Sequence, residues 1–103
     1  MPPSNKYLLR RIYALIKSED PTLLFKKNPW LDGTVREGWY NGDFLCLNIK
    51  SDDNLIAILL HEYIHCIYNK WSEKKVERKE KSLYKYLSVR QTKNLYKLLV
   101  EMM

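Results

Sequence analysis

Cysteine, glycine and histidine are scarce in this chain of 103 residues, which contains two, three and two of them. The two cysteines, Cys46 and Cys66, are too few for a disulfide framework and lack Cys-x-x-Cys spacing, so we expect buried thiols. Long hydrophobic runs are missing too. The longest runs from Leu55 to Leu60, whereas a membrane-spanning helix needs about 20 residues. These absences argue against a disulfide-stabilised domain and against the membrane as a partner.

Signals for export and for several domains are also missing. Residues 1–6 contain no apolar segment followed by a small-residue cleavage site, which favours a cytoplasmic location. The length suits one domain, 1–103, and the sequence has neither an internal repeat nor a low-complexity linker. Because 46% of the residues are hydrophobic and 13% are aromatic, we expect this domain to fold around a modest core.

The first half of the chain predicts a helix followed by a β-hairpin. Apolar residues recur at helical spacing over 6–17, and 22–26 reads as a loop or a minor strand. Two strand-like runs, 34–40 and 44–49, are joined by Asn41-Gly42, which favours a tight hairpin turn. The outer strand of this hairpin would offer an edge along which an extended peptide can bind.

The second half predicts three further helices. Ser51, followed by two aspartates, can cap a helix over about 52–70. Ser72 can cap the next helix, and Ser88 with Gln91 forms a capping box at the start of the last one. The order of elements predicts an α+β fold.

The pattern His61-Glu62-Tyr63-Ile64-His65 carries the most chemistry in the sequence. Residues four apart lie on one face of a helix, so both histidines can bind one Zn²⁺ ion. Glu62 borders the same ion and can take a proton from a zinc-bound water as that water attacks a carbonyl group. A chance match of this short motif is the alternative, but both histidines of the chain are used in it, on a capped and apolar helix.

The third metal ligand must be an acidic residue or a cysteine, because the chain has no third histidine. Cys66 is turned about 100° around the helix from His65, so we assign it to the core.

Three glutamates on the next helix compete for this role, and the choice depends on where the histidine helix ends. If that helix continues to about Lys70, Glu73 follows the turn too early to return to the histidines. Glu80 lies on the apolar face of its helix, whereas Glu77 lies at the edge of that face. We therefore predict Glu80 as the third ligand, with Glu77 second and Glu73 last.

The positive charge of the chain suggests a second class of function. Lysine and arginine outnumber aspartate and glutamate by 18 to 12, which gives a net charge of +6 with the excess after Asn69. A basic nucleic-acid-binding module is therefore the alternative reading. The cations recur all round the two last helices, as on an ordinary solvated surface, so nucleic acid ranks below a peptide partner.

The stretch from Phe44 to His65 resembles the gluzincin metallopeptidases, and more specifically the soluble minigluzincins. It contains a strand ending at Ile49, the polar segment 51–54, an apolar helix and HEYIH. Minigluzincins are small proteins similar to the catalytic domains of membrane metallopeptidases such as the CAAX prenyl peptidases, HtpX and the β-lactam sensor peptidases. The order of elements fits along nearly the whole chain, while only HExxH is a specific motif.

The resemblance implies a zincin-like domain with Zn²⁺ on the two histidines, Glu62 as general base and acid, and a third ligand on a glutamate helix. In the membrane relatives that glutamate begins an ExxAD signature. Counted from Glu80, Tyr84 stands where the acidic residue belongs. Counted from Glu73, the signature is matched better, with Glu77 at the acidic position.

The resemblance also implies latency, because minigluzincins have C-terminal segments that cover the cleft. The candidate segment here is 88–103, and the alternative is a fourth helix that packs on the core. The resulting hypothesis is a zinc-dependent endopeptidase that acts on a peptide or protein substrate, and its latent form is a zymogen whose C-terminal helix must move. A catalytically silent, zinc-stabilised scaffold is a further alternative, and the apolar C-terminal helix also allows self-association.

Overall fold

Helix α1 (Asn5–Ser18) is the first element among the described residues. The computed structural model of the protein describes residues 4–27, 30–31, 34–35, 37–50 and 54–103. The Ser4 side chain caps α1 by accepting a hydrogen bond from the backbone N–H of Tyr7. One face of α1 is buried, so the amphipathic helix predicted over 6–17 is confirmed.

After α1, the described residues form a three-stranded and a two-stranded sheet. The strands are β1 (Thr22–Lys26), β2 (Trp30–Leu31), β3 (Thr34–Val35), β4 (Gly38–Tyr40) and β5 (Phe44–Asn48). The larger sheet has the order β1-β5-β4, with β1 parallel and β4 antiparallel to β5. The smaller sheet pairs β2 with β3.

The hairpin predicted around Asn41-Gly42 is present as β4 and β5. Its turn is held by the Asn41 side chain, which accepts hydrogen bonds from the backbone N–H groups of Asp43 and Phe44. Gly42 has a φ of 100°, which favours glycine. The prediction of one outer strand over 34–40 is wrong, because β3 pairs with β2 and only β4 pairs with β5.

Three helices complete the chain, α2 (Leu55–Ile67), α3 (Glu73–Tyr86) and α4 (Val89–Met102). Asn54 caps α2, whereas the predicted cap Ser51 and the two aspartates after it lie outside the described residues. The prediction that α2 continues to about Lys70 is wrong, because the helix ends at Ile67. The capping box of Ser88 and Gln91 at the start of α4 is confirmed.

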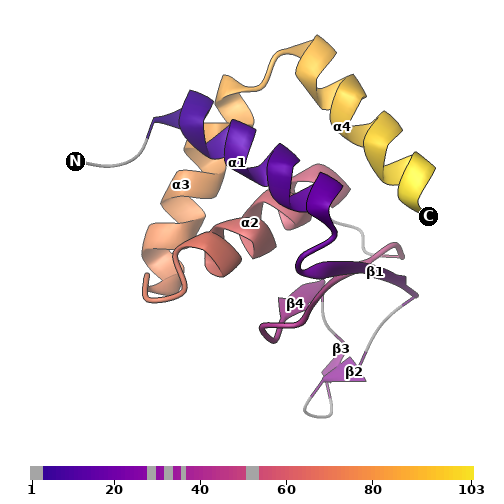
Figure 1. The fold of residues 1–103 in the computed structure, drawn as a ribbon. Coiled ribbons are helices and arrows are strands. Elements are labelled where there is room, and N and C mark those ends of the chain that lie inside the picture. The colour runs from indigo at the N-terminus through magenta and orange to yellow at the C-terminus, as the bar shows by residue number, and fades with distance from the viewer. Residues whose placement is uncertain (1–3, 28–29, 32–33, 36, 51–53) are drawn as a thin grey trace.

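Helix α2 lies at the centre of the α+β fold and contacts β4, β5, α3 and α4. Figure 1 shows the strands gathered at one end, with the helices beside them. One hydrophobic cluster joins buried side chains of α1, β5, α2, α3 and α4, and α2 contributes the fully buried Leu59, Leu60 and Tyr63. Among the described residues, none of the helices has the length and apolar character needed to cross a bilayer.

Candidate metal site

Two turns of α2 place both histidines of the chain on the face that meets α3. The rings of His61 and His65 lie edge to face, with their centroids 4.8 Å apart. Both side chains are partly buried, at 18% and 26% exposed. The four-residue spacing therefore puts two imidazoles side by side, as the sequence predicts.

Glu73, in the first turn of α3, completes a cluster with the two histidines. Its Oε1 lies 2.7 Å from Nε2 of His61, and its Oε2 lies 2.8 Å from Nε2 of His65. One ligand atom from each of the three residues can be chosen so that all lie within 4.8 Å of one another. His61, His65 and Glu73 are thus close enough to bind one metal ion.

The turn between α2 and α3 explains why Glu73 reaches the histidines. Tyr68 and Trp71 stack with ring centroids 4.2 Å apart, and the Lys75 ammonium lies 4.3 Å from the centroid of the Trp71 ring. The backbone N–H of Trp71 also donates to the Tyr68 carbonyl at 3.0 Å. Because α2 ends before this turn, the chain folds back early and α3 begins opposite His65.

Glu80, two turns further along α3, contacts the other nitrogen of His61. Its Oε1 lies 2.7 Å from Nδ1 of His61, and its side chain is 21% exposed. A carboxylate can only accept hydrogen bonds, so Glu80 keeps the proton of His61 on Nδ1. Without a metal ion, a protonated His61 can donate to Glu80 from Nδ1 and to Glu73 from Nε2. With a metal ion bound, the proton on Nδ1 would leave the Nε2 lone pair free to coordinate it.

The structure therefore orders the three glutamates differently from the sequence. Glu73, ranked last, meets both histidines, and Glu80, ranked first as the ligand, contacts the histidine nitrogen on the far side from Glu73. Glu77 is exposed and forms no hydrogen bond or ion pair with a described residue. The ranking depended on an α2 that continued to Lys70, and the earlier end of α2 removes that argument.

Glu62 lies on the side of α2 that faces strand β4. A Cβ atom added to Gly38 would lie 3.1 Å from Cγ of Glu62, 2.9 Å from Cγ2 of Ile58 and 3.0 Å from the Cys46 carbonyl oxygen. Strand and helix approach this closely only because residue 38 has no side chain. Gly38 was not predicted from the sequence, where its one signal is its place directly before Trp39 and Tyr40.

The environment raises the pKa of the Glu62 carboxyl group. Burial is the main cause, and the carboxylates of Glu73 and Glu80 add to it, while His61 and His65 act in the opposite direction. A partly buried carboxylate with a raised pKa is a better proton acceptor than a fully exposed one.

The pKa of His61 is raised as well. Burial lowers this pKa, but the hydrogen bond to Glu80 and the charges of Glu62, Glu73 and Glu80 together outweigh burial. A proton and a metal ion therefore compete for this imidazole at a higher pH than for an exposed histidine.

Comparisons of the chain with protein-family models, with curated proteins and with solved structures found no match. The metal site is thus defined by its geometry alone. Two imidazole nitrogens and one carboxylate oxygen are donors that suit several first-row divalent metals, zinc among them.

The two cysteines lie outside the metal cluster. Both are free thiols. Cys46 is fully buried in β5, as expected, whereas Cys66 on α2 is only partly buried. Burial raises the pKa of the Cys66 thiol, and its hydrogen bond with Tyr40 lowers it. Cys66 thus packs against the sheet rather than joining the histidines.

Proposed function

We propose that the protein is a zinc-dependent peptidase with a gluzincin type of site, in which His61, His65 and Glu73 hold the metal. The observation that carries the proposal is the contact of one carboxylate with Nε2 of both histidines, at 2.7 and 2.8 Å. Two histidines and a glutamate are the protein ligands of one well-known class of catalytic zinc sites. We also propose that the fold is zincin-like.

The donor set fits zinc on two counts. Each histidine presents Nε2 to the same carboxylate, and Glu80 fixes the tautomer of His61 that leaves Nε2 free to coordinate. When bound, zinc polarises a carbonyl group and lowers the pKa of water. Glu73 is the most exposed member of the set, at 60%, so the site is open on its side to solvent and substrate.

Glu62 is the general base of this proposal. It neighbours His61 in the chain, packs against Gly38, and has a pKa raised mainly by its partial burial. Its carboxylate takes a proton from the attacking water and returns one to the leaving amine. Strand β4 is one of the two edge strands of the three-stranded sheet and contacts α2, so an extended peptide added to β4 would lie beside Glu62.

The experiment that tests the proposal is cleavage of an internally quenched peptide library by the zinc-loaded full chain. Replacement of Glu62 by Ala is expected to lower kcat/KM by about 10²- to 10⁴-fold while zinc stays bound. Glu77→Ala is the matched control, because it removes an exposed carboxylate of the same site region. No cleavage by the zinc-loaded chain, or equal cleavage by the Glu62→Ala variant, contradicts the proposal.

Latency through residues 88–103 stays a prediction and is separate from the proposed function, which is that of an active full chain. Helix α4 has Leu95 and Leu99 fully buried in the core, and Tyr13 donates a hydrogen bond to the Gln91 carbonyl. A chain cut before Ser88 would lose these contacts and some of its stability. The activity assay is therefore designed for the full chain, and stable zinc binding without cleavage of any peptide would favour the silent scaffold instead.

A further inference from the structure

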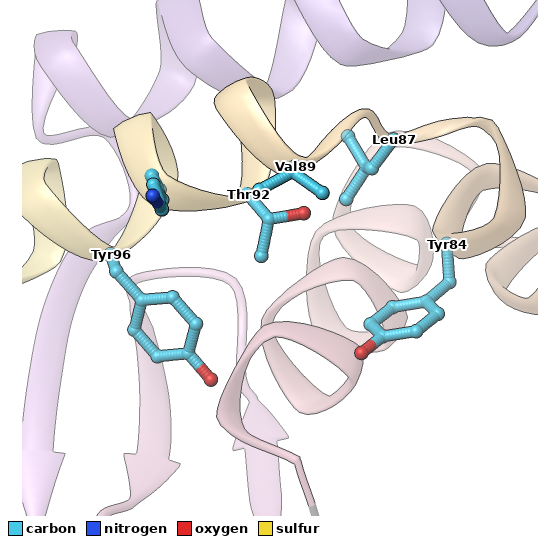
Figure 2. A pocket seen from close by; sticks show the side chains of 6 residues that line it. Tyr84, Leu87, Val89, Thr92 and Tyr96 are labelled. Atoms are coloured by element: carbon cyan, nitrogen blue, oxygen red, sulfur yellow. The ribbon is translucent and has the colours of Figure 1, made fainter.

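A pocket lies where the end of α3 meets the start of α4, lined by Tyr84, Leu87, Val89, Thr92, Lys93 and Tyr96. Figure 2 shows the rings of Tyr84 and Tyr96 extending to the same side from their two helices, with Leu87, Val89 and Thr92 between them. The Tyr84 hydroxyl accepts a hydrogen bond of 2.7 Å from Nδ2 of Asn54, the cap of α2. The pocket therefore has apolar walls and fixed polar groups, as ligand sites do.

Apolar side chains continue from the pocket along the outer face of α4. Val89, Tyr96, Val100 and Met103 are 74%, 40%, 66% and 59% exposed, and their spacing places them on one face of the helix. The buried residues Leu95 and Leu99 face the core from another side. Helix α4 thus carries a second apolar face that no described residue covers, and we call Tyr84, Val89, Tyr96, Val100 and Met103 the docking strip.

Cations border the docking strip on its solvent side. Arg90, Lys93 and Lys97 lie beside it on α4, and none of them forms an ion pair with any residue that the structure describes. The chain as a whole carries a charge of +6. Unpaired positive charge next to exposed apolar side chains is complementary to an acidic partner that also presents an apolar anchor.

Tyr84, the member of the docking strip that lies on α3, is aligned with the metal site along the α2–α3 interface. Glu73 meets His65, Glu80 meets His61, and Tyr84 meets Asn54, so α3 runs antiparallel to α2. Asn54 precedes His61 by seven residues, which corresponds to about 10 Å at the helical rise of about 1.5 Å per residue. An extended peptide would cover that distance with about three residues at about 3.3 Å each.

We propose that the docking strip binds an acidic segment of the peptide substrate and takes one of its aromatic or apolar side chains into the pocket between Tyr84 and Tyr96. This inference rests on the proposed peptidase function and names its class of substrate. The pocket holds a residue a few positions from the cleaved bond. The row of Arg90, Lys93 and Lys97 binds carboxylates that follow this residue.

Binding is measured separately from cleavage, by fluorescence anisotropy on the zinc-loaded full chain with Glu62→Ala. The probes are a labelled peptide with one phenylalanine among glutamates, the same peptide with alanine for phenylalanine, and a version with lysines for the glutamates. The acidic phenylalanine peptide is expected to bind best, and its affinity to weaken as salt is raised. Equal binding of all three peptides overturns the proposal.

Variants of the docking strip locate the binding. Tyr96→Ala is expected to lower affinity for the phenylalanine peptide by about tenfold or more, as for an aromatic anchor, and to leave the alanine peptide unchanged. Lys93→Glu should weaken both acidic peptides at low salt. The control Arg78→Glu makes the same charge change on an exposed residue of α3 outside the strip, and should have a smaller effect. Equal effects of Lys93→Glu and Arg78→Glu contradict a local docking site.

Two further outcomes overturn the proposal. Binding of a single-stranded oligonucleotide that is tighter than peptide binding and lost with Lys93→Glu would assign the cations to nucleic acid. Dimerisation that Tyr96→Ala abolishes would assign the strip to a second copy of the chain. If the acidic peptide binds as described while the wild-type chain cleaves nothing, the docking site stands and the peptidase function fails.

Discussion

The two ends of the α2–α3 pair differ in how their charges are arranged. At the His65 end, His61 and His65 meet the carboxylates of Glu73 and Glu80 at 2.7 to 2.8 Å. At the Asn54 end, the nearby cations of α4 lack a described partner and apolar side chains are exposed. The first end is a compact set of groups that suits an ion, whereas the second is an open surface that suits a larger partner.

This difference shows how one helix pair can combine two tasks. Core residues between the two ends, such as Leu59 and Leu83, are fully buried and hold the helices together. Each end is then positioned by its own contacts, the Tyr68–Trp71 stack at one and the Asn54–Tyr84 hydrogen bond at the other. Substitutions can therefore affect one end and leave the other intact.

The largest effect is the expected difference in stability between substitutions on the buried and the exposed face of α4. Leu95→Ala removes a fully buried side chain and should lower the free energy of unfolding by about 2–5 kcal/mol. Val100→Ala, on the exposed face, should change it by no more than about 0.5 kcal/mol. Urea unfolding followed by circular dichroism measures both, and equal losses would mean that the outer face of α4 is covered.

A slightly smaller effect is expected at the metal end. Glu73→Ala removes the carboxylate that meets both histidines and should lower zinc affinity by more than about 100-fold, beyond the range typical of indirect partners. Glu77→Ala should leave the affinity unchanged. Competition with a chromophoric chelator measures both, and the reverse order would restore the ranking derived from the sequence.

Glu80 is expected to act on the metal through His61. Glu80→Gln should lower zinc affinity by about 10- to 100-fold at neutral pH, because the tautomer and orientation of His61 are less fixed.

The pH dependence of zinc binding gives a second readout of Glu80. A raised pKa means that His61 keeps its proton to a higher pH, so zinc affinity of the wild type should fall as the pH drops through a value above the ordinary about 6.5. Glu80→Gln removes a group that raises this pKa, so the fall should move to lower pH. An unchanged midpoint would show that Glu80 does not act through His61.

The smallest effect is expected at the Asn54 end. Asn54→Ala removes the cap of α2 and its bond to Tyr84, which should cost about 1 kcal/mol of stability. Asn54→Asp keeps an acceptor for the backbone N–H groups of Ile56 and Ala57 and should cost less. Zinc affinity should be nearly the same in both variants, and a large loss would mean that the two ends are coupled.

Local signals in the sequence predicted much of the fold. The periodicity of α1, the Asn41-Gly42 turn and the capping box at Ser88 each depend on residues close in the chain, and each is present. The parallel pairing of β1 with β5 was not predicted, because it joins residues that are distant in sequence. The division of 34–40 into β3 and β4 has the same cause, since β3 pairs with a strand that precedes it.

The sequence predicted the part of the metal site that lies on α2 alone. Helical spacing was enough to place His61 and His65 together, because both lie on α2. Which glutamate of α3 meets the histidines depends on where α2 ends. The stacking of Tyr68 on Trp71 belongs to the turn after α2 and produces no periodic pattern in the sequence from which that end could be predicted. An error of less than one helical turn in the end of α2 was enough to exchange the expected positions of Glu73 and Glu80.

The central claim, that His61, His65 and Glu73 hold one zinc ion, is tested most directly by metal analysis of the purified full chain. Mass spectrometry under native conditions should find one zinc per chain in the wild type and none in His61→Ala or His65→Ala. Circular dichroism of each variant establishes that it remains folded. A wild-type chain without stoichiometric zinc, or a folded His61→Ala variant that keeps it, would contradict the claim.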